Sequence, residues 1–319
     1  MRANYRPAVL FFVIVLILGL SNIYAAEKLN IATSVKQVPL YVLPVLAAED
    51  SGYWKQQGLD VKYIPFRSGS SMHRAVAAGS VDMGLATAVS VIQAASRRVP
   101  EVIVADLKAR NPFSLWVPTA SPIKSARDIK KARIAVTRLG GTLHAFGQAM
   151  AKILGLEKKI RFVGAGGIPE MMASLKAGNV EGMMGDIASV APLKYEGAVR
   201  ELISGPDYLP NRWVDLVVFS QKDLTKKKPK VVGAVIKAVL KGANLAGTNE
   251  AWAVNKMKSY LHYSQGVAKM IYPMIRYSSD GKIDVQGLNN VRTFLIEYGI
   301  IRKGRPPALE KLYTKEFTG

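Results

Sequence analysis

The stretch AAGSVDMGLAT at residues 77–87 is nearly repeated ninety-nine positions later as KAGNVEGMMGD at residues 176–186. Each copy has the pattern of a helix that ends at a glycine, a tight turn at Ser or Asn, and a strand that begins Val-Asp or Val-Glu. A loop of small residues precedes each helix, SGSS in the first copy and GAGG in the second. The repeat therefore predicts two lobes that share one α/β building unit.

Strand-like and helix-like segments alternate around both copies. LNIATS (29–34), LDVKYIPF (59–66) and VIVADL (102–107) have the apolar patterns of strands, and segments with helical spacing lie between them. At this spacing, the alternation predicts an α/β fold with parallel sheets that carry helices on both faces.

The order of these segments predicts that the chain passes twice between the lobes. FSLWVP (113–118) looks like a strand that leaves the first unit, and WVDLVVFSQ (213–221) looks like a strand that returns to it. Two crossings, near 109–115 and 205–213, would form a hinge. The predicted leader is 1–26. The predicted first lobe consists of 27–110 and 209–319, and the second lobe of 111–208.

The first 26 residues have the composition of a signal peptide. Arg2 and Arg6 precede thirteen uncharged apolar residues, 8–20, and the small residues that follow favour cleavage after Ala25 or Ala26. A retained membrane anchor is the alternative, because the uncharged stretch is close to the about 20 residues that a span needs. Its last third is polar and small, so we expect a cleaved, exported protein in the periplasm. No cysteine follows to carry a lipid.

Charge and composition exclude several function classes. The net charge is +21, and loss of Arg2 and Arg6 leaves 42 Lys and Arg against 23 Asp and Glu, or +19. The basic residues are spread along the chain without a recognition-helix or zinc-finger pattern, which argues against nucleic acid as a partner. Such a charge instead favours an anionic ligand, although it can also serve contact with an anionic membrane surface.

The residue types needed for a metal site or for catalysis do not occur in the patterns that those sites require. The chain has no cysteine, which rules out disulfides, thiolate metal sites and cysteine nucleophiles. His73, His144 and His262 lie in different segments without a metal-binding spacing. No nucleophile elbow or Ser-His-Asp order is found either. We therefore expect no metal, no cofactor and no enzymatic activity.

One further set of residues resembles a known family. Gly52, Tyr53 and Trp54 follow a helix, GLDV stands at 58–61, and AAG–VD-G spans 77–84. With these motifs, residues 46–86 resemble periplasmic substrate-binding proteins of ABC transporters, of the nitrate/sulfonate/taurine type that also includes thiamine-precursor binders. The likeness continues through the stretches 132–156 and 171–186.

The resemblance implies the type 2 periplasmic-binding-protein fold, in which two α/β lobes are joined by a two-crossing hinge with the ligand cleft between them. It also implies a small-molecule solute that is captured by hinge closure, a membrane permease of an ABC transporter as partner, and a monomer.

Ligand sites of open α/β sheets lie beyond the carboxyl ends of the strands, beside helix N-termini whose N–H groups attract anions. Three loops have this place in the sequence: RSGSSM (67–72), RLGGTLH (138–144) and GAGGIPE (164–170). In the first loop the alternative is ordinary helix capping, in the second a tight turn, and in the third glycines that serve packing alone. The ligand-binding residues predicted from the first two loops are Ser70, Ser71, Gly140, Gly141 and Thr142.

Strand ends and the cleft rim supply the remaining candidates. Thr87 and Ala88 end the first repeat, and Asp186 ends the second, where it can accept a hydrogen bond from a ligand or cap the next helix. Lys36, in the loop after the first strand, can meet an anion. Trp213 either stacks on a flat ligand or packs in the core. The full set of these candidates is Ser34, Lys36, Thr87, Ala88, Asp186 and Trp213.

The predicted ligand is a small anionic organic solute such as a sulfonate or carboxylate, since the charge is positive and both lobes offer helix N-termini. A thiamine-precursor pyrimidine is an alternative, with Asp186 and an aromatic side chain as its partners. A ligand-sensing module that is not coupled to transport is another. Pyrimidine-precursor synthases also resemble the family, but they carry a cysteine-rich motif that this chain lacks.

Overall fold

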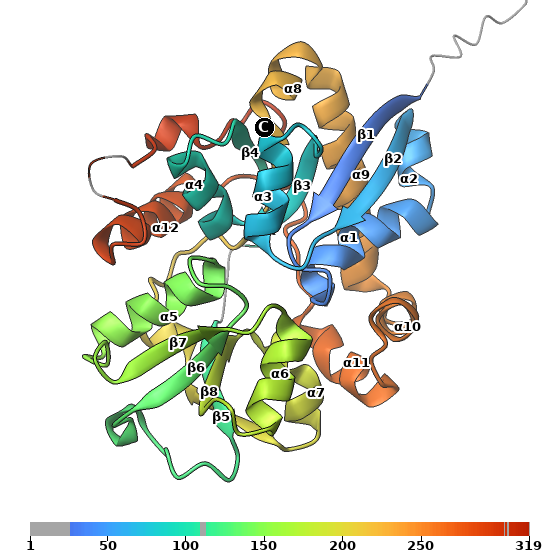
Figure 1. Ribbon diagram of the computed structural model, residues 1–319. Coiled ribbons are helices and arrows are strands. Elements are labelled where there is room, and N and C mark those ends of the chain that lie inside the picture. Colours follow the sequence, from blue (N-terminus) through green and yellow to red (C-terminus); the bar gives the residue numbers. More distant parts are fainter. Residues whose placement is uncertain (1–25, 109–112, 303, 305, 319) are drawn as a thin grey trace, which may run out of the picture.

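The computed structural model describes residues 26–108, 113–302, 304 and 306–318, which form two α/β lobes (Figure 1). All of the predicted leader except Ala26 lies outside the described residues, as do residues 109–112 at the start of the first predicted crossing.

The first lobe is built on a five-stranded sheet with the order β2-β1-β3-β10-β4. Its strands are β1 (Glu27–Thr33), β2 (Leu59–Pro65), β3 (Met83–Thr87), β4 (Glu101–Lys108) and β10 (Leu216–Gln221). Its helices are α1 (Pro39–Asp50), α2 (Tyr53–Gln56), α3 (Gly69–Ala77), α4 (Ala88–Ser96), α8 (Lys222–Lys227), α9 (Pro229–Thr248), α10 (Glu250–Leu261), α11 (Gln265–Ile271) and α12 (Val285–Glu297), with short 3-10 turns at Tyr272–Met274 and Leu309–Lys311.

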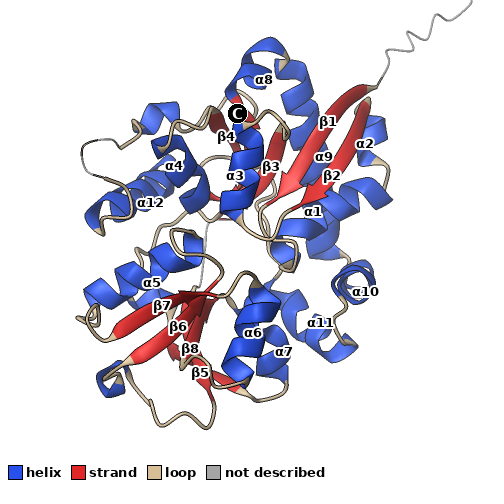
Figure 2. Ribbon diagram, viewed as in Figure 1, coloured by secondary structure: helices blue, strands red, loops and turns tan. Residues whose placement is uncertain are grey.

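The second lobe repeats this plan in a sheet with the order β7-β6-β8-β5-β9. Figure 2 shows helices flanking both sheets. The strands are β5 (Ser114–Pro118), β6 (Ala132–Val136), β7 (Ile160–Gly164), β8 (Gly182–Gly185) and β9 (Val199–Ile203). The helices are α5 (Thr142–Ile153), α6 (Ile168–Lys176) and α7 (Ile187–Tyr195), with 3-10 turns at Ala126–Asp128 and Gly205–Asp207.

The two sequence repeats occupy the same place in the two lobes. Each consists of a helix, α3 or α6, followed by the third strand of its sheet, β3 or β8. Gly79 and Gly178 follow these helices with φ values of +74° and +70°, a left-handed conformation that glycine adopts without strain. The repeated glycines thus end equivalent helices, as the sequence predicts.

The sheets are mixed, whereas the sequence pattern predicts parallel ones. In each sheet the fourth strand is antiparallel to both neighbours: β10 runs against β3 and β4, and β5 runs against β8 and β9. These are the strands that the chain forms directly after it passes from the other lobe. They begin at the edge where the parallel strands end, so they must run in the opposite direction.

Helix α9 packs along α1 in the core of the first lobe. It is long and apolar enough to cross a membrane, but its apolar stripe, which includes Val232, Val235 and Val239, is buried inside the protein. Gly242 lies on the same face, where a Cβ atom would stand 2.1 Å from the carbonyl oxygen of Pro44 in α1. The two helix backbones therefore approach closely at this glycine.

We predict that Gly242→Ala lowers the free energy of unfolding by about 1–3 kcal/mol, because the added methyl group must push α1 and α9 apart. Gly233→Ala on the same helix is the matched control, since its Cβ would meet only a side-chain carbon of Phe317 at 3.9 Å. This control should raise the stability by up to about 1 kcal/mol through helix propensity. Urea denaturation measures both, and equal effects would contradict the packing argument.

Candidate functional site

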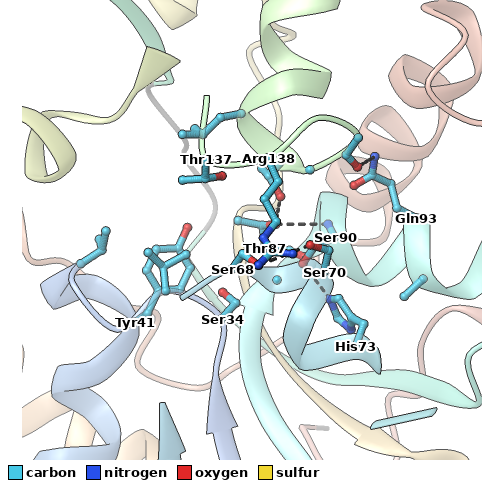
Figure 3. Close-up of a pocket in the computed structure, with 18 of the residues that line it drawn as sticks. Ser34, Tyr41, Ser68, Ser70, His73, Thr87, Ser90, Gln93, Thr137 and Arg138 are labelled. Atoms are coloured by element: carbon cyan, nitrogen blue, oxygen red, sulfur yellow. Dashed lines mark hydrogen bonds between the residues drawn. The ribbon is translucent and has the colours of Figure 1, made fainter. Parts of the chain in front are cut away.

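A cavity of about 350 Å³ lies between the two lobes (Figure 3). Strands β1, β3 and β6 end at it, and helices α3, α4 and α5 begin at it. Of the residues predicted from the sequence, the following line it: Ser34, Ser70, Thr87, Gly140, Gly141, Thr142 and Asp186. They come from both lobes and from segments up to 152 residues apart, so the fold brings most of the predicted set together.

Three predicted residues do not line the cavity. Ser71 turns its hydroxyl back to the carbonyl of Ser68 at 2.8 Å, as serines in a first helical turn often do. Ala88 is fully buried and donates its N–H to the carbonyl of Asp215 at 2.7 Å. Lys36 is exposed outside the cavity lining. The structure thus places these three residues outside the cavity lining, and their role in ligand binding stays a prediction.

Trp213 also lies outside the cavity lining, and it packs in the core, which is one of the two placements that the sequence left open. Its ring lies 5.6 Å from that of Phe146 in α5 and 5.2 Å, edge to face, from that of Phe294 in α12. The side chain is 3% exposed. The residue stands where the chain returns from the second lobe to the first. Its ring therefore packs between α5 of the second lobe and α12 of the first.

The N-terminus of α3 presents free N–H groups to the cavity. Ser68 caps the helix by accepting the N–H of Ser71, and the helix begins at Gly69, one residue earlier than the serines that the sequence analysis singled out. The first four N–H groups of a helix have no partner within it. Gly69 and Ser70 line the cavity at this point, where their N–H groups are available to a ligand.

The loop before α5 is preorganised in the same way in the second lobe. Gly140 has a φ of +78°, and its N–H donates to Nδ1 of His144 at 2.9 Å. Partial burial lowers the pKa of His144, which favours the neutral ring that this acceptor role requires. No side chain caps α5 at Gly141, so the N–H groups of its first turn are left for a ligand.

Three contacts join the lobes around the cavity. The hydroxyls of Thr87 and Thr142 are 3.1 Å apart, and the Gln93 amide donates to the carbonyl of Gly140 at 3.4 Å. Arg67, just before α3, forms an ion pair with Glu170 in α6. Both members of that pair are about half exposed. The first two contacts involve Thr87, Thr142 and Gly140, which are predicted ligand residues. The same residues therefore line the cavity and connect the two lobes.

Among the described residues, positive groups outnumber negative ones in the cavity lining. Arg74, Arg97 and Arg138 line the cavity, and Asp186 is the one acidic residue of the described chain that does. Asp186 is 5% exposed and accepts the N–H and the hydroxyl of Ser189, both at 2.7 Å, so it caps α7 as well. Burial, followed by the charges of Asp215 and Asp186, raises the pKa of the Tyr41 hydroxyl, which also lines the cavity.

Ser34 provides an unpaired donor. Its side chain is 2% exposed, and its hydroxyl has no hydrogen-bond partner among the residues that the structure describes. It lines the cavity and lies below Ser68 and Thr87 in Figure 3. A buried polar group without a partner is destabilising, and a ligand oxygen in the cavity would supply that partner.

The sequence analysis missed a buried group of residues on the first-lobe side of the cavity. His73 places Nε2 3.0 Å from the hydroxyl of Ser90 and Nδ1 2.9 Å from a carboxylate oxygen of Glu101. His73 and Ser90 line the cavity, while Glu101 is fully buried behind them. One signal was available in the sequence: His73 lies beside Met72 and three residues before Val76, on the apolar face of α3.

No group of three or more histidine or acidic side chains that could hold a metal ion occurs in the part of the chain that the structure describes.

Comparisons with known proteins agree with this architecture. A family model described as NMT1/THI5 like matches residues 40–251. The 4-amino-5-hydroxymethyl-2-methylpyrimidine phosphate synthase THI11 of Saccharomyces cerevisiae is 30% identical over 83 residues, 26% of this chain and 24% of the relative. The taurine-binding periplasmic protein of Escherichia coli is 28% identical over 197 residues, 61% of this chain and 60% of the relative. The chain thus aligns with less than two thirds of either relative.

The structure is also similar to that of the periplasmic aliphatic sulphonate-binding protein SsuA from Escherichia coli. The TM-score is 0.73, with 15% sequence identity and coverage of 90% of this chain and 91% of that chain. A likeness at this identity concerns the fold alone. It confirms the predicted periplasmic-binding-protein fold.

We predict that Ser34→Ala leaves the free energy of unfolding of the ligand-free protein unchanged or raises it by up to about 1 kcal/mol, because it deletes an unpaired buried hydroxyl. Ser68→Ala is the matched variant at the same cavity. It removes the cap of α3 and should lower the stability by about 1 kcal/mol. Thermal unfolding of both proteins tests this, and a clear loss of stability in Ser34→Ala would show that its hydroxyl is already paired.

Proposed function

The chain belongs to the NMT1/THI5-like family, and from this premise we propose that it is an extracytoplasmic solute-binding protein without enzymatic activity. It captures a small anionic organic solute, sulfonate-like or carboxylate-like, by closure of the two lobes. It then delivers the solute to the permease of an ABC importer. The names of the taurine-binding and sulphonate-binding proteins support this class of function.

The observation that carries the proposal is the set of hydrogen-bond donors around one end of the cavity. Helices α3 and α5 direct free N–H groups there from opposite lobes, and the unpaired hydroxyl of Ser34 lies beside them. Helix N-termini carry partial positive charge, which the arginines of the lining reinforce. The carboxylate of Asp186 is engaged in capping α7. An anionic oxygen group is the ligand feature that fits this arrangement.

The rest of the cavity suits an organic part of the solute. Apolar side chains from both lobes line it, among them Val38, Phe113, Leu143 and Ile168. A volume of about 350 Å³ lies at the small end of the usual range of ligand pockets. A solute with an anionic head and a short apolar or aromatic body would use both parts.

The cross-lobe contacts support closure as the binding mechanism. A solute that touches donors of both lobes binds the closed arrangement better than an open one, and this difference in affinity drives closure. We propose in addition that the leader is cleaved near Ala25 or Ala26, that the mature protein is a periplasmic monomer, and that the crossing segments act as the hinge.

A thiamine-precursor pyrimidine is the second candidate ligand. The carboxylate of Asp186 can accept from a ring amine, and the yeast relative is a synthase of such a pyrimidine. Residues 1–319 contain no cysteine, so a synthase that depends on a cysteine-rich motif is disfavoured. A sensor that binds the same solute without transport shares the site and differs only in its partner.

We predict that one chemical class in a thermal-shift panel stabilises the mature protein from Glu27 onward. The panel covers alkanesulfonates, taurine, aliphatic and aromatic carboxylates, nitrate and thiamine-like pyrimidines. A ligand at a hundred times its dissociation constant adds about 2.7 kcal/mol, which should raise the midpoint by roughly 4 °C or more. The protein is first unfolded and refolded to remove any ligand that copurifies. A shift with pyrimidines alone would favour the second candidate, and no shift at all would contradict the proposal.

Variants test whether the cavity is the binding site. Thr142→Val and Ser34→Ala each remove one hydroxyl from the cavity and should weaken binding of the stabilising solute by about tenfold, the usual size of one hydrogen bond. Thr119→Val is the matched control, because its hydroxyl bonds the carbonyl of Gly197 and is not part of the cavity lining. Calorimetric titration measures the three affinities. Equal affinities in all three variants would place the ligand elsewhere.

A further inference from the structure

The buried chain Ser90–His73–Glu101 joins the cavity to the inside of the first lobe. Ser90 belongs to α4, His73 to α3, and Glu101 begins β4. The exposed fractions are 6% for Ser90, 5% for His73 and 0% for Glu101. The second carboxylate oxygen of Glu101 is buried and has no hydrogen-bond partner in the described part of the chain. A buried carboxylate that is only half satisfied is costly as an anion, so the position of the protons in this chain matters.

One arrangement of the hydrogens gives the pair two protons. In it the Ser90 hydroxyl donates to the carbonyl of Thr87 at 2.9 Å and accepts from Nε2 of His73 at 3.0 Å. A second proton must then lie between Nδ1 and Glu101, since both are otherwise acceptors. With both protons present, the His73–Glu101 pair is neutral overall.

Loss of one proton reverses the direction of the hydrogen bonds from Ser90 through His73 to Glu101 and leaves these three side chains with a net negative charge. Nδ1–H then donates to the Glu101 carboxylate, Nε2 becomes an acceptor, and Ser90 must turn its hydrogen from Thr87 toward His73. The pair now carries one net negative charge directly behind a residue of the cavity lining. Burial raises the pKa of Glu101, and the charge of His73 and that of Lys222 oppose the shift.

Charged side chains from several elements surround the His73–Glu101 pair. Lys222 approaches Glu101 from α8, Arg74 stands next to His73 on α3, and Arg97 follows α4. Arg138 and Asp186 line the cavity from the second lobe. The proton shared by His73 and Glu101 therefore lies among charged groups of both lobes.

We propose that the Ser90–His73–Glu101 chain is a proton-linked determinant of solute specificity: its protonated, neutral form retains an anionic solute, and its deprotonated form weakens binding. This inference rests on the proposed function, because it concerns an anion in the same cavity. The inference also goes beyond the proposed function. It assigns the preference for anions to particular residues, and it states that the affinity for an anion falls as the pH rises. Linkage requires the reciprocal effect, namely that a bound anion holds the proton on the pair.

Calorimetric titration with methanesulfonate between about pH 5.5 and pH 9 tests the proposal, because this ligand keeps its charge over that range. The dissociation constant should rise by about tenfold as the pair loses its proton, the effect expected of one unit charge across a partly screened cavity. Glu101→Gln together with His73→Gln removes both ionisable groups and should abolish the dependence. His262→Asn is the matched control, because this histidine is exposed and lies outside the cavity lining, and it should keep the dependence. An affinity of the wild type that is independent of pH overturns the proposal.

A measurement without the organic solute separates this proposal from the proposed function. The ring signals of His73 in NMR spectra of the ligand-free wild type should titrate in the same range, and sulfate at matched ionic strength should move their midpoint to higher pH. If methanesulfonate fails to bind but sulfate moves the midpoint, the pair acts as proposed and the assigned solute is wrong. If methanesulfonate binds and His73 does not titrate, the solute is right and the pair is not the determinant. If neither effect is seen, both proposals fall.

Discussion

The direction in which each strand runs is the constraint on which the rest of the structure depends. The parallel strands of both sheets end at the edge that faces the other lobe, and the chain leaves each lobe from that edge. The strand that enters from the other lobe, β5 or β10, begins at the same edge and closes the sheet in the antiparallel direction. Every loop that follows a parallel strand is therefore directed into the space between the lobes.

This constraint also determines the electrostatics of the cavity. A helix that follows such a loop begins at the cavity, so α3, α4 and α5 all present their N-terminal ends to it. Their free N–H groups favour an anion before any side chain contributes. The side chains have different roles. Thr87 and Thr142 form a hydrogen bond between the lobes, and the Ser34 hydroxyl has no partner among the described residues and can donate to a ligand. The chemistry of the site is thus largely a consequence of topology.

The same reasoning explains which parts could be predicted from the sequence. The repeated Gly79 and Gly178 mark equivalent helix ends, because a left-handed turn restricts the residue locally. The loop pattern indicated that Thr142 stands at the start of a helix. The sequence left both ligand stacking and core packing open for Trp213, because its ring contacts Phe146 and Phe294, which are 67 and 81 residues away in the sequence. The role of His73 depends on Ser90 and Glu101 in other elements, and no local pattern reports such contacts.

The contacts between the lobes differ in strength. The Arg67–Glu170 pair is about half exposed, so it contributes roughly 0–1 kcal/mol, and the hydroxyl contact of Thr87 with Thr142 adds about 1 kcal/mol. At the junction of the lobes, by contrast, the rings of Phe146, Trp213 and Phe294 form a buried cluster whose separation would expose large apolar surfaces. The contacts around the cavity are therefore weak compared with the aromatic packing at the junction, and α11 of the first lobe also packs against α7 of the second.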